Sequence, residues 1–264
     1  MPKARRIIRT RRQSIGVFLM LFALSALTLT ACSHQRPSPE KNQAIDTYQQ
    51  LGYTYLRSNQ LGRAQKYFHQ ALALNAHDPK ALHGLALIFA RQNERRLAEH
   101  YFIETLQSDT DSTIARNNYA AFLFKQSRYD EARSQLQVAV QDIRYPHRDR
   151  ILLNLGRCEL KLGQTQAALD HFQRALDLNP MAYDVHLELA TWYLKTQQLT
   201  KAQHHWQLFD AGRTQLNERA QKIGLQIAKA RGDQVMEAEL KSRQHNDPIS
   251  STNHLSDKDS QYHD

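Results

Sequence analysis

The side chains with the most chemical potential in this 264-residue chain are its thirteen histidines and two cysteines. A zinc site needs several such ligands at short, fixed spacings. His204 and His205 are adjacent, so on a helix they would point about 100° apart, and no histidine pair at metal-binding spacing has a third candidate ligand nearby. We therefore interpret the histidines as solvated surface residues and expect neither a metal nor a cofactor.

The sequence also lacks the patterns that accompany catalysis. It contains no Gly-x-Ser-x-Gly elbow and no cysteine and histidine that can be placed together. Its glycines fall at expected helix crossings, such as Gly52, Gly156 and Gly224, or in and near turns, so they build no phosphate-binding loop. The residues predict a binding protein with no small-molecule substrate, and not an enzyme.

The two cysteines have different surroundings. Cys158 lies between Leu155 and Leu160 in an expected helix, and we interpret it as a small core residue, with a reactive thiol as the alternative. Cys32 instead follows residues 1–31, a basic start and then an almost wholly apolar run over 15–30. That run is too short for an ordinary membrane span and predicts a cleaved signal peptide.

The end of the apolar run, Leu29-Thr30-Ala31-Cys32, resembles the lipobox of bacterial lipoproteins. The resemblance implies cleavage before Cys32, diacylglycerol on its sulfur and an acyl chain on its new amine, which together hold a protein on a membrane. An uncleaved anchor is the alternative. Ser33 follows instead of an aspartate, which in lipoprotein sorting resembles an address for the outer membrane, facing the periplasm. A lipidated Cys32 could not form a disulfide with Cys158.

The formal charge of +9 invites a nucleic-acid interpretation. Residues 1–31 contain no acid and contribute six of the cations, so removing this segment leaves +3. A modest residual charge gives little support for nucleic acid as a partner. The six cations are Lys3, Arg5, Arg6, Arg9, Arg11 and Arg12.

The rest of the chain repeats about every 34 residues, which is the spacing of the tetratricopeptide repeat, a pair of antiparallel helices. The pattern is clearest in Leu155, Gly156, Ala168, Phe172, Ala175 and Pro180, and two residues are inserted around Tyr145-Pro146-His147. It predicts an all-α fold, a right-handed superhelical solenoid of six repeats over 44–243, whose last repeat is atypical as a cap often is. We expect 32–43 to be a lipidated cysteine and flexible tether, and 244–264 a polar, disordered tail.

A solenoid of this kind binds partners along the wall formed by the first helix of each pair. The register places apolar residues on the floor of that wall and a cation just beyond it in all six repeats. Such a groove suits an extended or helical peptide with apolar anchors and some acidity. Each cation would also stabilise the C-terminal end of its helix, so both roles stay open. The predicted floor residues are Tyr53, Leu56, Leu87, Phe124, Leu153 and Leu160, and the predicted basic rim is Arg57, Arg91, Lys125, Lys161, Lys195 and Lys229.

We further predict that the partner lies over the first three repeats, on Tyr53, Leu56, Leu87 and Phe124. Exposed apolar patches of this kind mark partner sites. The alternative is that a short extra element covers these residues, which would make them ordinary core.

Several stretches match more than a generic repeat. They resemble the type IV pilus biogenesis and stability lipoproteins of the PilW/PilF type over about 44–238, and the likeness extends to the lipobox and to the insertion at Tyr145-Pro146. The stretches are Leu97-Ala98-Glu99, Asn117-Asn118-Tyr119-Ala120-Ala121-Phe122-Leu123, Gln126-Ser127-Arg128-Tyr129-Asp130-Glu131-Ala132, Tyr145-Pro146-His147-Arg148 and Asn154-Leu155-Gly156-Arg157-Cys158.

The resemblance implies a pilotin, which is an outer-membrane lipoprotein that binds the pilus secretin and promotes its localisation and multimerisation. It also adds Asn117 and Asn118 to the candidate partner-binding residues. Two departures are visible: Ala120 stands where the family usually has glycine, and a polar tail follows Glu239 in place of a short apolar ending. The alternative is a lipoprotein adaptor that docks cell-wall hydrolases or other envelope enzymes, because fold alone does not separate the two.

Overall fold

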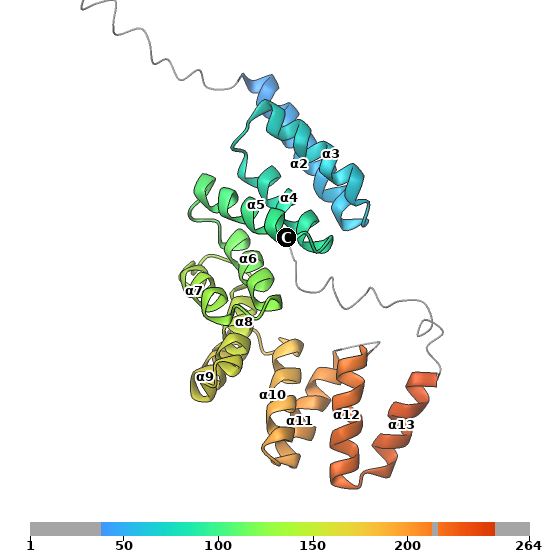
Figure 1. Ribbon diagram of the computed structural model, residues 1–264. Helices are drawn as coiled ribbons and strands as arrows, with labels where there is room; N and C mark the ends of the chain where they lie inside the picture. Colours follow the sequence, from blue (N-terminus) through green and yellow to red (C-terminus); the bar gives the residue numbers. More distant parts are fainter. Residues whose placement is uncertain (1–37, 213–215, 246–264) are drawn as a thin grey trace, which may run out of the picture. The chain divides into compact units, whose positions relative to one another are not determined.

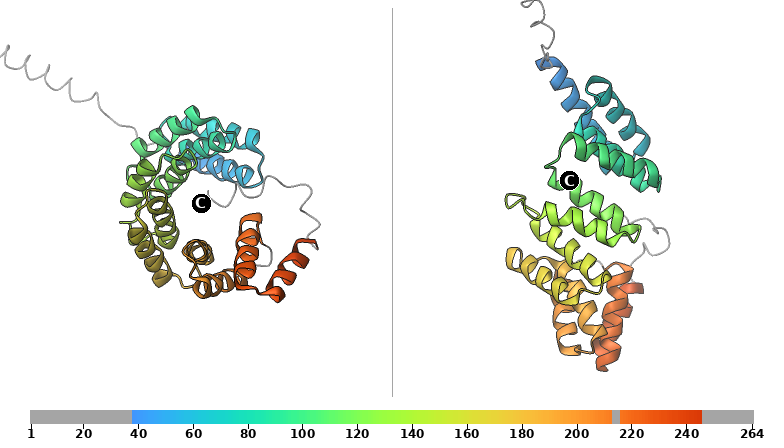
Figure 2. Two further views of the ribbon diagram at one scale, coloured as in Figure 1. Left: turned by 60° about the horizontal axis from the view of Figure 1, so that its bottom comes forward. Right: turned by 60° about the vertical axis from the view of Figure 1, so that its left-hand side comes forward.

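The computed structural model describes residues 38–212 and 216–245, and within them the chain is helical, without strands. Twelve described helices form six successive pairs (Figure 1), and the two views of Figure 2 show that the helices of a pair lie side by side. The predicted all-α tetratricopeptide-repeat fold is thereby confirmed. The pairs are α2 (Pro39–Arg57) and α3 (Leu61–Leu74), α4 (Pro79–Arg91) and α5 (Arg95–Ser108), α6 (Thr113–Lys125) and α7 (Tyr129–Ala139), α8 (Arg148–Lys161) and α9 (Thr165–Leu178), α10 (Tyr183–Lys195) and α11 (Leu199–Ala211), and α12 (Glu218–Arg231) and α13 (Gln234–His245).

Small residues on one helix and an aromatic ring on the next hold the first and fourth pairs together. A Cβ atom added to Gly156 of α8 would lie 2.3 Å from Cε1 of Phe172 on α9, so the two backbones approach as closely as the ring allows. On the second helices the alanine that the period predicts is fully buried in five repeats, which confirms the register. These residues are Ala64, Ala98, Ala132, Ala168 and Ala202.

The turn inside each pair has the same backbone form. One residue per turn has a positive φ, and the next amide donates a hydrogen bond to the carbonyl five residues before it, as Gln164 N does to Glu159 O at 2.8 Å. This arrangement satisfies a carbonyl that the end of the helix leaves unpaired. The left-handed residues are Asn59, Asn93, Ser127, Gly163, Gln197 and Gly232.

The links between pairs show where the insertion lies. Residues 75–78, 109–112 and 179–182 are short links, whereas the link between α7 and α8 spans 140–147. The helices on either side of this longer link keep their register, since Ala132 and Ala168 are both buried. The extra residues therefore enlarge one link and leave the repeat intact.

The first helix begins earlier than predicted. We expected a flexible tether up to residue 43, but α2 starts at Pro39. Proline suits the first position of a helix because its fixed φ is already helical and its missing N–H would have no partner there. Ser38 Oγ accepts a hydrogen bond from Lys41 N at 3.3 Å, and Glu40 lies in the first turn.

The predicted signal peptide, Cys32 and the tail after residue 245 lie outside the described residues. None of the helices in 38–212 and 216–245 combines the length and apolar character that a bilayer crossing requires.

Candidate functional site

The structure corrects the predicted floor of the first-helix wall, the surface formed by α2, α4, α6, α8, α10 and α12. Leu56 and Leu87 are only 2% and 3% exposed, and Leu153 is also buried, so these three side chains belong to the core and not to an open floor. Tyr53, Phe124 and Leu160 are half-buried.

The reason for this burial is that the neighbouring pairs approach the first helices more closely than the repeat pattern alone implies. Helix α4, which carries Leu87, packs against α3, α5 and α6, and every residue from Ala81 to Phe89 is buried. Helix α8, which carries Leu153, touches α6, α7, α9 and α10. At the end of α2, Arg91 Nη1 donates to Leu56 O at 2.7 Å, which brings the last turn of α4 against Leu56.

The part of the wall that stays accessible lies between α6 and α8. A hollow there is lined by Ala120, Ala121, Phe124, Leu136, Asn154, Arg157 and Cys158. Lys125 and Lys161, the exposed residues that follow Phe124 and Leu160, flank it. This hollow has a volume of only about 10 Å³, so a partner would lie over it and on the half-buried surfaces of Phe124 and Leu160. We call the hollow together with these two residues the wall hollow.

Cys158 lies at the bottom of the wall hollow. Burial, reinforced by the charge of Glu159, raises the pKa of its thiol to about 12. A thiol at that pKa is protonated at neutral pH and is a poor nucleophile. The interpretation of Cys158 as a small core residue is confirmed, since its side chain is fully buried.

The cations of the predicted basic rim all lie in the last turn of their helices, where they complement the C-terminal end of the helix dipole. Arg91 is partly buried by its bond to Leu56 O. The other five side chains are exposed. Arg91 therefore links two repeats, whereas its five counterparts leave their charges near solvent.

Neutral hydrogen bonds connect the first helices of the first four pairs. Tyr53 OH lies 3.2 Å from His83 Nδ1, and Asn118 Nδ2 lies 3.1 Å from His83 Nε2. Further along, Asn154 Nδ2 donates to Asn117 Oδ1 at 3.0 Å. Asn117 and Asn118, predicted to contact a partner, are buried between helices instead. Buried hydrogen bonds of this kind fix the relative position of neighbouring helices.

Charged hydrogen bonds continue the connection through the last pairs. Glu188 of α10 is almost fully buried, and it accepts Arg157 Nε at 2.8 Å and Arg219 Nη2 at 2.8 Å. Burial alone would raise the pKa of Glu188, but the two arginines outweigh it and lower the pKa to about 2. The carboxylate is therefore charged and joins α8, α10 and α12.

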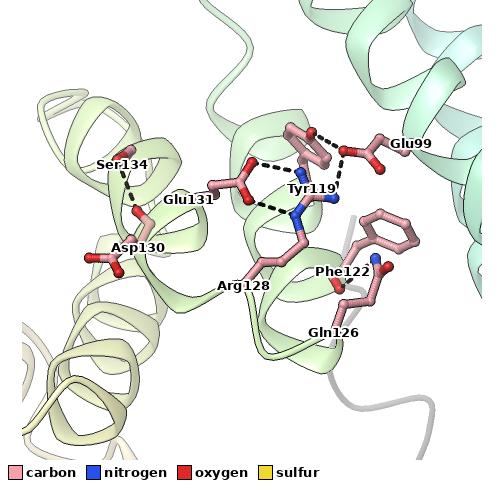
Figure 3. A network of polar contacts seen from close by, with 8 residues as sticks. All are labelled: Glu99, Tyr119, Phe122, Gln126, Arg128, Asp130, Glu131 and Ser134. Atoms are coloured by element: carbon pink, nitrogen blue, oxygen red, sulfur yellow. Dashed lines mark hydrogen bonds and ion pairs between the residues drawn. The ribbon is translucent and has the colours of Figure 1, made fainter.

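A second ionic network joins α5, α6 and α7 (Figure 3). Arg128 Nη1 donates to Glu99 Oε1 at 2.7 Å, Arg128 Nη2 donates to Glu131 Oε2 at 2.6 Å, and Tyr119 OH donates to Glu99 Oε1 at 3.1 Å. Burial and the nearby Glu99 raise the pKa of Tyr119 to about 12, so its hydroxyl keeps the proton that it donates. These residues lie in stretches that carry the family resemblance, and they tie helices together.

Four histidines of the described residues depart from the predicted solvated surface: His83, His171, His186 and His205. The Nδ1 atoms of His186 and His205 are 3.0 Å apart, so one hydrogen atom is shared between them, and the ring of His205 stacks on Tyr193. Burial, followed by the charges of His186 and His204, lowers the pKa of His205 to about 4. Among the described residues no three histidines, cysteines or carboxylates are arranged to hold a metal.

The chain is similar in sequence to a known repeat family and to a protein of type IV pilus assembly. Tetratricopeptide-repeat family models match residues 50–94, 111–180 and 159–205. The type IV pilus assembly protein PilF of Pseudomonas aeruginosa PAO1 is 33% identical over 215 residues, which cover 79% of this chain and 85% of PilF.

Two solved structures agree with that match. The structure of Pseudomonas aeruginosa PilF has a TM-score of 0.71 at 32% identity and covers 77% of this chain and 91% of its own. PilW, described as a widely conserved type IV pilus biogenesis factor, has a TM-score of 0.71 at 26% identity and covers 79% of this chain and 96% of its own. The chain belongs to the PilF family of tetratricopeptide-repeat proteins of type IV pilus biogenesis.

Proposed function

We propose that this protein is a pilotin, an outer-membrane lipoprotein that binds the type IV pilus secretin and promotes its localisation and multimerisation. The observation that carries the proposal is the 33% identity to the type IV pilus assembly protein PilF across 79% of the chain. The lipobox that ends in Cys32 supports attachment to a membrane. The protein acts by binding and not by catalysis.

The secretin segment docks on the wall hollow between α6 and α8. There Phe124 and Leu160 offer half-buried apolar surface beside the small hollow that Ala121 lines, so the segment lies on this surface. Lys125 and Lys161 supply exposed positive charge on either side. An amphipathic segment with an apolar anchor and acidic neighbours fits this combination.

The hydrogen-bonded helices behind the hollow favour tight docking. Asn154 is held by Asn117, and Arg157 is held by Glu188, so the polar lining of the hollow is fixed before a partner arrives. A preorganised surface loses less side-chain entropy on binding.

The test uses a strain that lacks the gene and is complemented with wild-type protein or with Cys32→Ala. Wild type should restore heat-stable secretin multimers in the outer membrane, measured by gel electrophoresis of membrane fractions. The Cys32→Ala protein should be absent from the outer-membrane fraction and should not restore the multimers, because the substitution removes the lipid and does not change the helices.

Two outcomes would contradict the proposal. Normal secretin multimers in the deletion strain would exclude a role in their assembly, and a cell-separation defect in the same strain would favour an adaptor for cell-wall hydrolases. Full retention of Cys32→Ala in the outer membrane would show that Cys32 is not the anchor.

A further inference from the structure

The links 140–147 and 179–182 differ from the links 75–78 and 109–112 in the side chains that they carry. Residues 75–78 and 109–112 carry small and polar side chains. In and beside the links 140–147 and 179–182, large apolar side chains are exposed to solvent instead. Ile143 is 77% exposed, Met181 is 63% exposed, and Leu178, the last residue of α9, is 53% exposed. A concentration of exposed apolar residues marks a contact surface, whereas scattered single ones do not.

These side chains surround hollows on one edge of the repeats. Ile143, Tyr145 and Leu178 line the same hollow, together with Arg150 and Asn179. Met181 lines an adjoining hollow that shares Asp149, Arg150 and Asn179 and that also contains Asp184. The two links thus form one continuous surface, which we call the edge hollow.

The longer link that carries Ile143 is held in place by its own hydrogen bonds. Thr113 Oγ1 donates to Asp142 Oδ2 at 2.8 Å, and Arg144 N donates to Asp142 Oδ1 at 3.1 Å. Arg148 Nε donates to Val140 O at 2.9 Å, and Tyr145 packs against the core. The inserted residues therefore build a fixed surface, and a partner would not have to order it on binding.

The charges on the lining favour an acidic occupant. The hollow beside Ile143 is lined by Arg148 and Arg150, with His147 next to them, against one carboxylate, Asp149. Asp149 Oδ2 already accepts a hydrogen bond from Asn179 Nδ2 at 2.8 Å. Arg144 and Arg150 are exposed. Complementary charge selects among partners and speeds their encounter.

We propose that the edge hollow is a second docking surface, separate from the wall hollow, which holds a short acidic segment of a partner protein. An apolar side chain of that segment sits in the hollow that Ile143 and Leu178 line, and its carboxylates face Arg148 and Arg150, which line the same hollow. A hollow of this kind receives an inserted side chain, whereas a lipid surface would need only protruding residues. The inference does not depend on the identity of the partner at the wall hollow.

The test measures the fluorescence anisotropy of labelled synthetic peptides on the full-length protein in detergent micelles. One peptide has a leucine and a phenylalanine flanked by glutamates, and its pair has the same apolar residues flanked by lysines. The glutamate peptide should bind saturably. The lysine peptide should have a dissociation constant about tenfold higher or more, which corresponds to the loss of roughly one charge pair. Arg150→Glu should reverse this preference, because it changes the sign of the charge beside Ile143.

Matched substitutions locate the binding. Ile143→Ser with Leu178→Ser should weaken the glutamate peptide about tenfold or more. Val235→Ser, which removes an 80% exposed apolar side chain on α13, should leave binding unchanged. Both substituted residues of the first variant are exposed, so its melting midpoint should stay close to that of the wild type.

Three results would overturn the proposal: no binding of the glutamate peptide, equal binding of both peptides, or binding that Ile143→Ser with Leu178→Ser does not weaken. If no peptide binds and the double substitution instead lowers the fraction of full-length protein that sediments with phosphatidylglycerol vesicles, the surface is a lipid contact and the proposal is wrong.

Discussion

The first four repeats and the last two repeats follow the same period but are joined by different interactions. In the first four, the rings of Phe68, Phe102 and Phe172 are fully buried, and neutral hydrogen bonds such as Asn154 to Asn117 connect the pairs. The last two have a separate apolar cluster around Trp206 and are tied to the fourth by the buried carboxylate of Glu188. The first helices of a common repeat can therefore be connected by uncharged hydrogen bonds or by a buried carboxylate, while the ionic network of Arg128 with Glu99 and Glu131 adds a charged contact within the first four repeats.

Truncating one large aromatic side chain in each region should lower the unfolding free energy more than any other substitution proposed below. Phe172→Ala and Trp206→Ala should each cost about 3–5 kcal/mol of unfolding free energy, because both rings fill the space beside a glycine. Phe172→Ala should lower the melting of the whole solenoid. Trp206→Ala should release α12 and α13 first, since repeat stability is a sum of unit and interface terms.

Hydrogen exchange resolved by segment, alongside thermal unfolding by circular dichroism, checks this difference. Equal loss of protection along the whole chain in both variants would show that the two regions are not distinct.

Removing the charge of Glu188 should have the next largest effect. Glu188→Gln should cost about 1–3 kcal/mol at neutral pH, below the range for a fully buried ion pair because Arg219 is 45% exposed and can be solvated. The low pKa of Glu188 makes this stabilisation complete above its ordinary value of 4.5 and lost as pH falls towards 2. The gap between variant and wild type should therefore close below pH 4.5.

Asn117→Ala serves as the neutral comparison, because it removes the bond that Asn154 donates to Asn117, which involves no titrating group. Its effect on denaturant unfolding should not vary between pH 7 and pH 3. A constant gap for Glu188→Gln over the same range would contradict the assigned role of the carboxylate.

The histidine pair should add a smaller pH dependence to the last repeats. Because burial lowers the pKa of His205 from 6.5 to about 4, the folded protein resists a proton that the unfolded chain accepts. Stability should fall as pH drops through 6.5 and level off near 4. His205→Phe should flatten this slope in melting midpoints, while His69→Gln on the surface of α3 should not change it.

The smallest predicted change in unfolding free energy comes from substitutions in one turn of each region. Gln197 has a positive φ of 58°, which costs a residue with a side chain about 1–2 kcal/mol, whereas Gly163 adopts 77° freely. Gln197→Gly should stabilise by about 0.5–1 kcal/mol after the greater flexibility of unfolded glycine is deducted. Gly163→Gln should destabilise by a similar amount in denaturant unfolding. If both substitutions lowered the stability, backbone strain in the turn would not be what determines the stability at these positions.

The sequence predicted the fold well because its signal is local and periodic. Small and aromatic residues recur at fixed positions, and the structure buries Ala98, Phe102, Ala168 and Phe172 as the period requires. The sixth repeat, predicted to be atypical, still forms two helices, the second of which begins at Gln234. The early start of α2 could have been anticipated from Ser38-Pro39-Glu40, which is a helix-start pattern.

The candidate site was harder to predict because it depends on contacts between repeats. Whether Leu87 is floor or core depends on how closely α3, α5 and α6 surround α4, and the period does not specify this distance. The partners of Glu188 lie 31 residues away on either side. The available signal was a polar residue within an apolar run, as Glu188 stands between Leu187 and Leu189, which indicates a buried partner.

The proposal that a secretin segment docks on the wall hollow is tested most directly by Phe124→Ser with Leu160→Ser in the complemented deletion strain. The control is Leu97→Ser with Ile103→Ser, two exposed residues on α5. Lys125→Glu with Lys161→Glu tests the same wall without changing its packing.

We predict that both wall variants stay folded at the assay temperature, with a somewhat lowered melting midpoint, and lose heat-stable secretin multimers, while the control retains them. Normal multimers in both wall variants, at wild-type protein levels, would contradict docking on the wall hollow.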